Sequence, residues 1–313
     1  MSAFGSMPQA FSDAREEHLA TRRAAGLFDF SFMGLYEFSG RSSLERLQSR
    51  NLDHFEPGRL AYTLLLNDDG SVFNDATLWR LDGDRFWLFT GRRGDFERLD
   101  GAVLDRSGEH AILALQGPSS GAILARLLGA EAVRSLRYFH FVEKESMVVA
   151  RLGYSGELGY ELMVPVRERA RLSQALLDAG RDAGIRPCGF AAADSLRIES
   201  GYVLFDREID GRANPRELGL ERLVGAPRSG FAVSKRLTGL EILDRPAGAG
   251  LPLAHVTREC DSPTLRKRIA LGFAEPGTQR PGTRLRLPDG RLARAARLPF
   301  YDPQRRRPRA APL

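Results

Sequence analysis

Three β-rich runs joined by very short turns constrain this chain more than any other feature. They read AYTLLL, SVFNDATLWRL and DRFWLFT, over residues 61–66, 71–81 and 84–90, and the turn sequences NDDG and DGD lie between them. Turns of this length join antiparallel neighbours, whereas parallel strands need a crossover of about a dozen residues or more. The runs therefore predict an antiparallel meander, and the helical patterns elsewhere in the chain place it in an α+β fold.

The length predicts more than one domain. A chain of 313 residues, 42% hydrophobic and 27% charged, has the composition of a globular protein and can bury two or three cores. No apolar run approaches the ~20 residues of a membrane span, and the charged N-terminal segment does not resemble a signal peptide. We therefore expect a cytoplasmic protein with no membrane partner.

The net charge of +6 and the pI near 9.7 raise nucleic acid as a partner. However, nine arginines against two aspartates fall within residues 284–313, which leaves the body of the chain close to neutral. Only three of the 46 basic residues are lysines, a bias that resembles genome composition more than a phosphate-binding surface. We predict no nucleic-acid partner and a solvated tail over residues 305–309.

The remaining pattern predicts helices and strands around the meander. One helix begins at Asp13 and ends at Gly26, and proline and glycine become dense beyond about residue 226, which indicates a small separate β domain. Further helices are expected at 95–106, 118–129, 166–183 and after 187, and strands at 35–40, 110–115, 146–154 and 159–165.

Short motifs exclude several functions. The five histidines and the cysteines Cys188 and Cys260 show no ligand spacing, and no phosphate-binding glycine loop occurs, so we predict no metal and no nucleotide. Gly117, Ser119 and Gly121 match the Gly-x-Ser-x-Gly pattern of hydrolases. A serine that starts a helix explains the match better, because the meander lacks the alternating βαβ units of that fold.

Two polar stretches are candidate sites. Asn74 and Asp75 interrupt an apolar strand and must point to opposite faces, so at least one can meet a packed side, where it would need partners. A solvated edge with a buried, hydrogen-bonded amide explains the pair equally well. The stretch GYSGELGYE combines Tyr154, Glu157, Tyr160 and Glu161 within nine residues. Its glycines allow close approach of a ligand, its tyrosines offer stacking faces, and a carboxylate there can accept two parallel hydrogen bonds from a ring NH and an amino group. An ordinary glycine-rich hairpin is the more common explanation of the second stretch.

Seven motifs in one order resemble the folate-dependent aminomethyltransferase superfamily, the glycine-cleavage T-protein and its demethylase relatives. They are EEHLATRRAAGLFDFSFMG, PGRLAYTLLLNDDGSVFND, LALQGP, RLGYSGELGYELMVP, PCGFAAADSLRIESGYVLF, NPRELGLERLV and SPTLRKRIALGF. The resemblance implies a three-domain cloverleaf with tetrahydrofolate in a central hole. It implies a first, folate-binding domain of residues 1–33 and 117–225, a second α+β domain of 34–116 with the meander, and a shortened C-terminal β-barrel of 226–313 with an arginine-rich tail.

The resemblance also implies site residues. Met33, Tyr62 and Tyr154 would line the folate pocket, and Glu161 would accept hydrogen bonds from the pterin ring NH and amino group. Asn74 and Asp75 stand where the T-protein has paired aspartates, and they are the catalytic candidates.

Departures from the T-protein pattern bear on the reaction. Asn74 replaces the first aspartate, as in the demethylase relatives, and an amide cannot take up a proton. Phe32 and Ala193 replace a histidine and an arginine of the family pattern. We expect a tetrahydrofolate-dependent one-carbon transferase that takes a methyl or aminomethyl group from a small donor or a lipoyl-bearing carrier protein, with demethylation slightly favoured. The alternative is a folate-binding or regulatory protein of the same fold without turnover.

Overall fold

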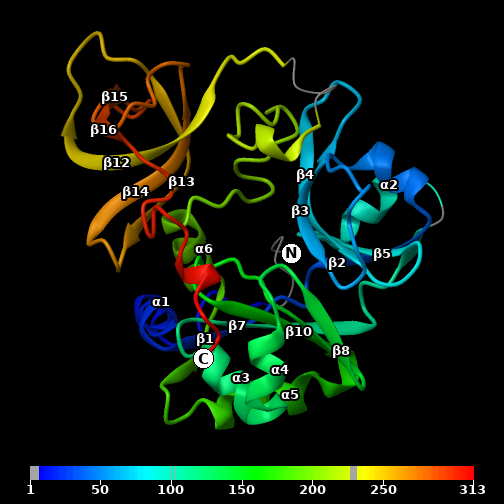
Figure 1. Cartoon of the computed structure of the whole chain (residues 1–313). Coiled ribbons are helices and arrows are strands. Elements are labelled where there is room, and N and C mark those ends of the chain that lie inside the picture. The colour runs from blue at the N-terminus through cyan, green and yellow to red at the C-terminus, as the bar shows by residue number, and fades with distance from the viewer. Residues whose placement is uncertain (1–6, 100, 102, 226–230) are drawn as a thin grey trace.

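Three lobes surround a common centre in the computed structural model, each built on its own sheet (Figure 1). The structure describes residues 7–99, 101, 103–225 and 231–313. Two of the sheets are antiparallel throughout, and the third contains one parallel pair of strands. The predicted α+β class is confirmed.

The first lobe is a six-stranded sheet with helices on one face. Its strand order is β11 (Ile185–Pro187), β1 (Ala25–Asp29), β7 (His110–Gln116), β10 (Gly159–Pro165), β9 (Met147–Ala150) and β8 (Phe141–Lys144). Helices α3 (Ser120–Leu128), α4 (Ala130–Ser135) and α5 (Arg169–Ala179) bury a common core with one face of this sheet. The opposite face packs toward the second lobe.

The second lobe contains the predicted meander. Strands β3 (Leu60–Leu66), β4 (Val72–Arg80) and β5 (Arg85–Thr90) are antiparallel neighbours, and the sheet continues through β2 (Gly34–Ser39) to β6 (Val103–Asp105). Helix α2 (Arg41–Leu47) covers one face with the fully buried Leu44. The helix predicted at 95–106 is wrong, because this segment forms a 3-10 turn (η1, Arg93–Arg98) and then edge strand β6.

The third lobe is a sheet in the order β13 (Ala254–Ser262), β14 (Lys267–Ala274), β12 (Arg236–Pro246), β16 (Arg291–Ala296) and β15 (Arg284–Arg286). A single bridge between Leu253 and Arg286 joins its two edges. This small, curled sheet corresponds to the shortened C-terminal part that the sequence predicts.

Sheet pairing also bears on the expected domain division. Strand β7, at the end of the predicted 34–116 segment, pairs with β1 and β10 in the first sheet. The division of the chain into three domains at the proposed boundaries stays a prediction.

Helix α1 (Ala14–Arg23) begins where the sequence predicts and ends earlier. The Asp13 side chain caps it by accepting a hydrogen bond from the Glu16 backbone NH at 3.0 Å. Gly26 does not end the helix but lies in β1, where a Cβ atom would come within 2.2 Å of the Thr21 hydroxyl. Close packing of strand on helix explains this glycine.

The backbone of the arginine-rich tail is docked, which the sequence did not predict, while the side chains of Arg306, Arg307 and Arg309 are exposed, as expected for a solvated segment. It runs from the third lobe past helix α6 (Phe190–Glu199) and ends beside α3 (Figure 1). The Tyr301 backbone NH donates to the Glu199 carbonyl at 2.9 Å, and Arg151 donates to the Ala310 carbonyl. The composition of the tail is that of a solvated segment, but buried partners from distant parts of the chain hold it.

Candidate functional site

Glu161 projects from the middle of β10 toward the second lobe. Side chains alternate along a strand, so Tyr160 joins the core under α3 and α5 while Glu161 faces the same way as Met163. The cluster that contains Met163 also contains Trp79 of β4. The carboxylate of Glu161 therefore points into the region between two lobes.

The Glu161 carboxylate is buried without a partner. Glu161 is 8% exposed. Among the residues that the structure describes, none forms a hydrogen bond or ion pair with its carboxylate oxygens. Burial raises the pKa of Glu161 to about 7. A buried, unpaired acceptor of this kind is costly for the ligand-free protein and suits a ligand that brings two N–H donors.

Asn74 and Asp75 point to opposite faces of β4, as the alternation predicts. Asn74 is fully buried, and its side-chain NH₂ donates to Asp95 at 2.5 Å on the face that α2 covers. Its side-chain carbonyl accepts a hydrogen bond from the Asp75 backbone NH at 2.9 Å. Asn74 therefore stabilises β4 on the face opposite to Asp75.

Asp75 faces the centre of the molecule. The Tyr62 hydroxyl donates to the Asp75 carboxylate at 2.8 Å. Burial raises the pKa of Asp75 to about 6, and the neighbouring carboxylates of Asp95 and Glu208 act in the same direction, against the Tyr62 hydrogen bond. This acid can exchange a proton near neutral pH.

Tyr154 lies at the same centre. Its hydroxyl donates to the Val203 carbonyl, and its ring stacks on Tyr202 with centroids 5.8 Å apart. The pKa of Tyr62 lies well above its ordinary value. Burial is the largest cause, and the nearby Asp75, Tyr154 and Tyr202 add to it. Tyr154 and Tyr202 therefore form a stacked pair, and the Tyr62 hydroxyl lies against the Asp75 carboxylate.

Met33 packs partly buried against the cluster that joins the first two lobes, as does Phe32. Phe32 also contacts a small cluster with Tyr154 and Phe205. Ala193 lines a cavity of about 10 Å³ with Tyr154, which has room for a single water and not for a pterin. The two departures from the family pattern thus make this wall of the site apolar.

Two neighbours of the site escaped sequence reasoning. Asp95 lies in the segment wrongly predicted to be helical, and Tyr202 follows α6 in a stretch that carries no local chemical signal. In the sequence, the pair Gly201-Tyr202 directly after the predicted helix is the one local feature that marks this tyrosine. Both residues reach the site through tertiary packing.

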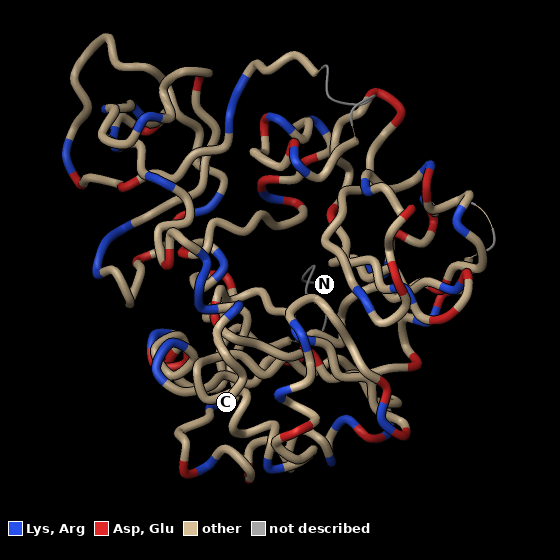
Figure 2. Tube along the Cα trace, viewed as in Figure 1, with Lys and Arg blue, Asp and Glu red and all other residues tan. Residues whose placement is uncertain are grey.

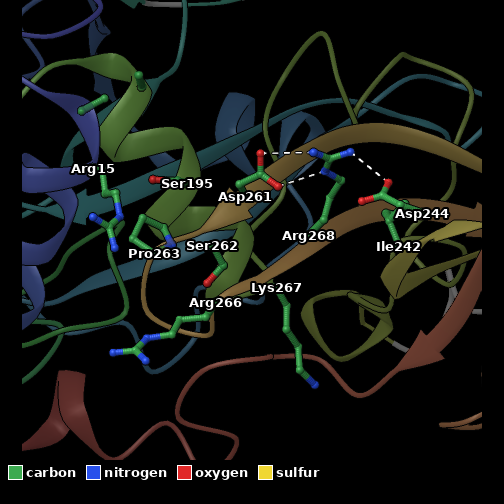
Figure 3. Close-up of a pocket in the computed structure, with 12 residues that line it drawn as sticks. Arg15, Ser195, Ile242, Asp244, Asp261, Ser262, Pro263, Arg266, Lys267 and Arg268 are labelled. Carbon is green, nitrogen blue, oxygen red and sulfur yellow. Dashed lines mark hydrogen bonds and ion pairs between the residues drawn. The ribbon is translucent and has the colours of Figure 1, made fainter.

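A separate cavity of about 550 Å³ lies between α1, α6 and the β13–β14 hairpin (Figure 3). Arg268 spans Asp261 and Asp244 at 2.9 and 3.1 Å. Lys267 pairs with Glu241. None of the six predicted site residues lines this cavity, so it does not coincide with the site between the lobes.

Ser119 occupies the first position before α3, as the helix-start interpretation predicts, although its side chain makes no capping hydrogen bond. Strand β7, which precedes it, is antiparallel to both neighbours, unlike the strand before a hydrolase nucleophile. Within the described residues no group of three or more metal-ligating side chains occurs, and no helix there is long and apolar enough to cross a membrane.

Comparisons with known proteins agree on one family. The family model for the GCVT N-terminal domain matches residues 3–227. The aminomethyltransferase of Symbiobacterium thermophilum is 34% identical, with 96% of this chain and 92% of that protein covered. The aminomethyltransferase of Chlorobaculum tepidum is 34% identical over 87% of this chain and 86% of its own length.

A solved structure agrees with this assignment at the level of the fold. The glycine cleavage system aminomethyltransferase T from Bartonella henselae superposes with a TM-score of 0.81 at 26% identity, covering 95% of this chain and 92% of that one. The chain belongs to the folate-dependent aminomethyltransferase family of the glycine-cleavage T-protein, and it is an enzyme of this tetrahydrofolate-dependent kind.

Proposed function

We propose that this enzyme transfers an aminomethyl-derived one-carbon unit to tetrahydrofolate held between the lobes, with Glu161 as the pterin anchor. The observation that carries the proposal is the buried and unpartnered Glu161 carboxylate. Bound tetrahydrofolate supplies the nitrogen that takes up the one-carbon unit. Met33, Tyr62 and Tyr154 provide the walls that hold its rings.

Glu161 selects the ligand through its charge. An ionised carboxylate accepts two parallel hydrogen bonds from the ring NH and the amino group of a pterin. Because burial raises its pKa to about 7, Glu161 must release a proton when it binds the ligand below that pH. Binding therefore weakens in acid, by about tenfold for each pH unit below 7.

Asp75 is the proposed catalytic acid–base group. The Tyr62 hydroxyl orients its carboxylate, and a pKa of about 6 lets the carboxylate hold a proton for a departing amine or stabilise a cationic donor. Asn74 acts as a positioning residue through its hydrogen bonds to Asp95 and to the Asp75 backbone. Holding donor and acceptor in line contributes up to ~7 to 11 kcal/mol, so placement carries much of the rate.

The donor distinguishes two versions of the reaction. Relatives named aminomethyltransferase and the Asp75 carboxylate, oriented by the Tyr62 hydroxyl, support aminomethyl transfer, with a lipoyl-bearing protein as the proposed carrier. The Asn-Asp pair at 74–75 favours the second candidate, demethylation of a small methyl donor. The fully buried position of Asn74 weakens that argument, because its amide is bonded to Asp95.

Titration calorimetry with tetrahydrofolate under anaerobic conditions tests the anchor. We expect Glu161→Ala to abolish binding, while Glu143→Ala, an exposed glutamate of the same sheet, leaves it unchanged. Repeating the titration in two buffers of different ionisation enthalpy at pH 6 measures the proton that is released. Unchanged affinity of Glu161→Ala would refute the site.

Turnover tests separate the two donors. Aminomethyl transfer from a lipoyl carrier yields ammonia and a folate at the methylene level, whereas demethylation yields methyl-folate. Mass spectrometry of the folate after incubation with each donor class identifies the reaction. Tight folate binding with neither product would support the alternative of a binding protein without turnover.

A further inference from the structure

The loop that follows helix α6 carries part of the wall of the proposed folate site. Tyr202 of this loop stacks on Tyr154, and the Val203 carbonyl accepts the hydrogen bond from the Tyr154 hydroxyl. Figure 2 shows this segment, which carries several acidic positions, running between the second and third lobes. Because the loop contacts both the ring and the hydroxyl of Tyr154, the position of the loop determines where this side chain stands.

A fully buried ion pair holds the loop. Arg197 of α6 donates to the Glu208 carboxylate at 2.7 Å and to the Tyr202 carbonyl at 3.1 Å. The same carboxylate oxygen of Glu208 accepts a hydrogen bond from the Leu204 backbone NH at 2.9 Å. Both charged side chains are 0% exposed. The pair therefore fixes the loop backbone on both sides of Val203.

The third lobe reaches this ion pair through a β-bulge in strand β13. The register of β13 on β14 shifts between Val256 and Arg258, which makes Thr257 the extra residue of the bulge. A bulge of this kind re-aims a side chain relative to the sheet. The Thr257 hydroxyl donates to the other oxygen of the Glu208 carboxylate.

The next residue of β13 contacts the second acid beside Arg197. Arg258 donates to the Asp194 carboxylate at 2.6 Å, and Arg197 donates to the same carboxylate at 2.8 Å. Consecutive side chains of a regular strand point to opposite faces, so the bulge explains how Thr257 and Arg258 both face α6. Two consecutive residues of the third lobe thus bind the two carboxylates that hold Arg197.

We propose that the β13 bulge of the third lobe positions the stacked tyrosine pair of the folate site, with Thr257 and Glu208 as positioning residues. The inference rests on the proposed function and adds a contribution of the third lobe to the affinity for the ligand. The contacts lead from Thr257 through Glu208 to the loop backbone, which in turn holds the Tyr154 hydroxyl. Loss of the Thr257 hydroxyl leaves one oxygen of a buried carboxylate without its donor, and a shift of the loop toward another donor relieves that cost.

Anaerobic calorimetry with tetrahydrofolate on the full chain tests this role. Thr257→Val removes the hydroxyl and keeps the branched shape, and we expect a rise in Kd of about 3- to 30-fold, the effect of substitutions that act on a ligand site without touching the ligand. Thr257→Ser keeps the hydroxyl and should restore the wild-type Kd. Thr238→Val is the matched control and should leave the Kd unchanged, because this buried threonine of the same lobe bonds to the adjacent Gly239 carbonyl.

A double-mutant cycle shows whether Thr257 and Glu208 act through one contact. Glu208→Gln also weakens the pair with Arg197 and should raise the Kd more than Thr257→Val does. Adding Thr257→Val to Glu208→Gln should cause little further loss, because the hydroxyl then has no charged acceptor. Fully additive losses would overturn the positioning role. If Glu208→Gln does not fold, the comparison of Thr257→Val with Thr257→Ser decides alone.

The outcomes separate this proposal from the proposed function. An unchanged Kd of Thr257→Val overturns the positioning role and leaves the proposed function standing. An equal loss of affinity in Thr257→Ser or in Thr238→Val also overturns it, because the lost hydroxyl of Thr257 is then not the cause. Failure of the wild-type protein to bind tetrahydrofolate refutes the proposed function itself. Urea unfolding of each variant checks that the protein is folded under the conditions of the titration.

Discussion

Two buried glutamates of the first lobe differ in their surroundings. Glu199 is fully buried and bonded to Arg22 at 2.8 Å, with His18 at 3.2 Å and the Ser262 hydroxyl as further partners. Burial alone would raise the pKa of Glu199, but these partners outweigh it and lower the pKa to about 2. Glu161 has burial without such partners, and its pKa rises to about 7.

The contrast distinguishes a buried charge that the fold pairs from one that it leaves unpaired and that we propose binds the folate. The fold compensates the acids around Arg22, including Glu157 at 3.0 Å, because an unpaired buried charge would cost it stability. It leaves Glu161 uncompensated at the one place where a ligand with N–H donors is expected. Four substitutions test whether this distinction holds, beginning with the largest effect.

Removing Arg22 should cause the largest loss of stability. Arg22→Ala leaves Glu199 and Glu157 without their shared cation and also uncovers the Tyr301 ring, so we expect a loss of about 3 to 5 kcal/mol. Urea unfolding at pH 7 measures it. Arg22→Lys keeps the positive charge but lacks the planar guanidinium, so its loss of stability should be smaller than that of Arg22→Ala and larger than zero. A loss below about 1 kcal/mol would mean that the pairing does not stabilise the lobe.

Neutralising Glu161 should increase the free energy of unfolding, whereas removing Arg22 should decrease it. The folded-state pKa near 7 lies above the ordinary 4.5, so the wild-type protein loses stability as the pH rises from 4.5 to 7. Glu161→Gln should therefore stabilise the protein by about 2 to 3 kcal/mol at pH 8 and change nothing at pH 4, while folate binding is lost. Thermal unfolding at both pH values is the measurement; destabilisation at pH 8 would show that Glu161 has a stabilising partner.

Restoring the family's aspartate at position 74 should be harmful in this chain. Asn74→Asp places a second carboxylate against Asp95, where the amide NH₂ now donates at 2.5 Å. We expect a loss of about 1 to 3 kcal/mol at pH 8, which shrinks in acid as one carboxyl takes up a proton. Chemical unfolding at pH 8 and pH 5 checks it. An unaffected protein with higher turnover would place position 74 at the reaction centre instead.

The smallest change in stability is expected for a solvent-exposed ion pair. Arg85 and Asp82 form an ion pair at 2.7 Å with side chains 52% and 73% exposed. Solvent screens such a pair, so Arg85→Ala should leave the thermal unfolding midpoint unchanged within error. A shift comparable to that of Arg22→Ala would remove the distinction between buried and exposed pairs on which the comparison depends.

Local patterns predicted the elements that local forces control. The turns after Leu66 and Leu81 fixed the meander, and the apolar pattern around Asn74 and Asp75 required opposite faces, which the structure confirms. The prediction of a helix at 95–106 is wrong because the apolar residues of this segment belong to a 3-10 helix and to an edge strand that pairs with β2. The tail was predicted in part: most of its arginines are exposed, as its composition indicates, but partners distant in the sequence hold its backbone.

The sequence by itself determined the family, the meander and the identity of the candidate acids, because residue order and strand alternation express these directly. Only the tertiary structure decided which acids are paired. Arg22 and Glu199 are 177 positions apart, and His18 and Thr264 are 246 apart. No local pattern encodes whether such partners arrive from so far away. The contacts of His18 and Arg22 lower the pKa of Glu199 to about 2, whereas burial raises the pKa of Glu161 to about 7.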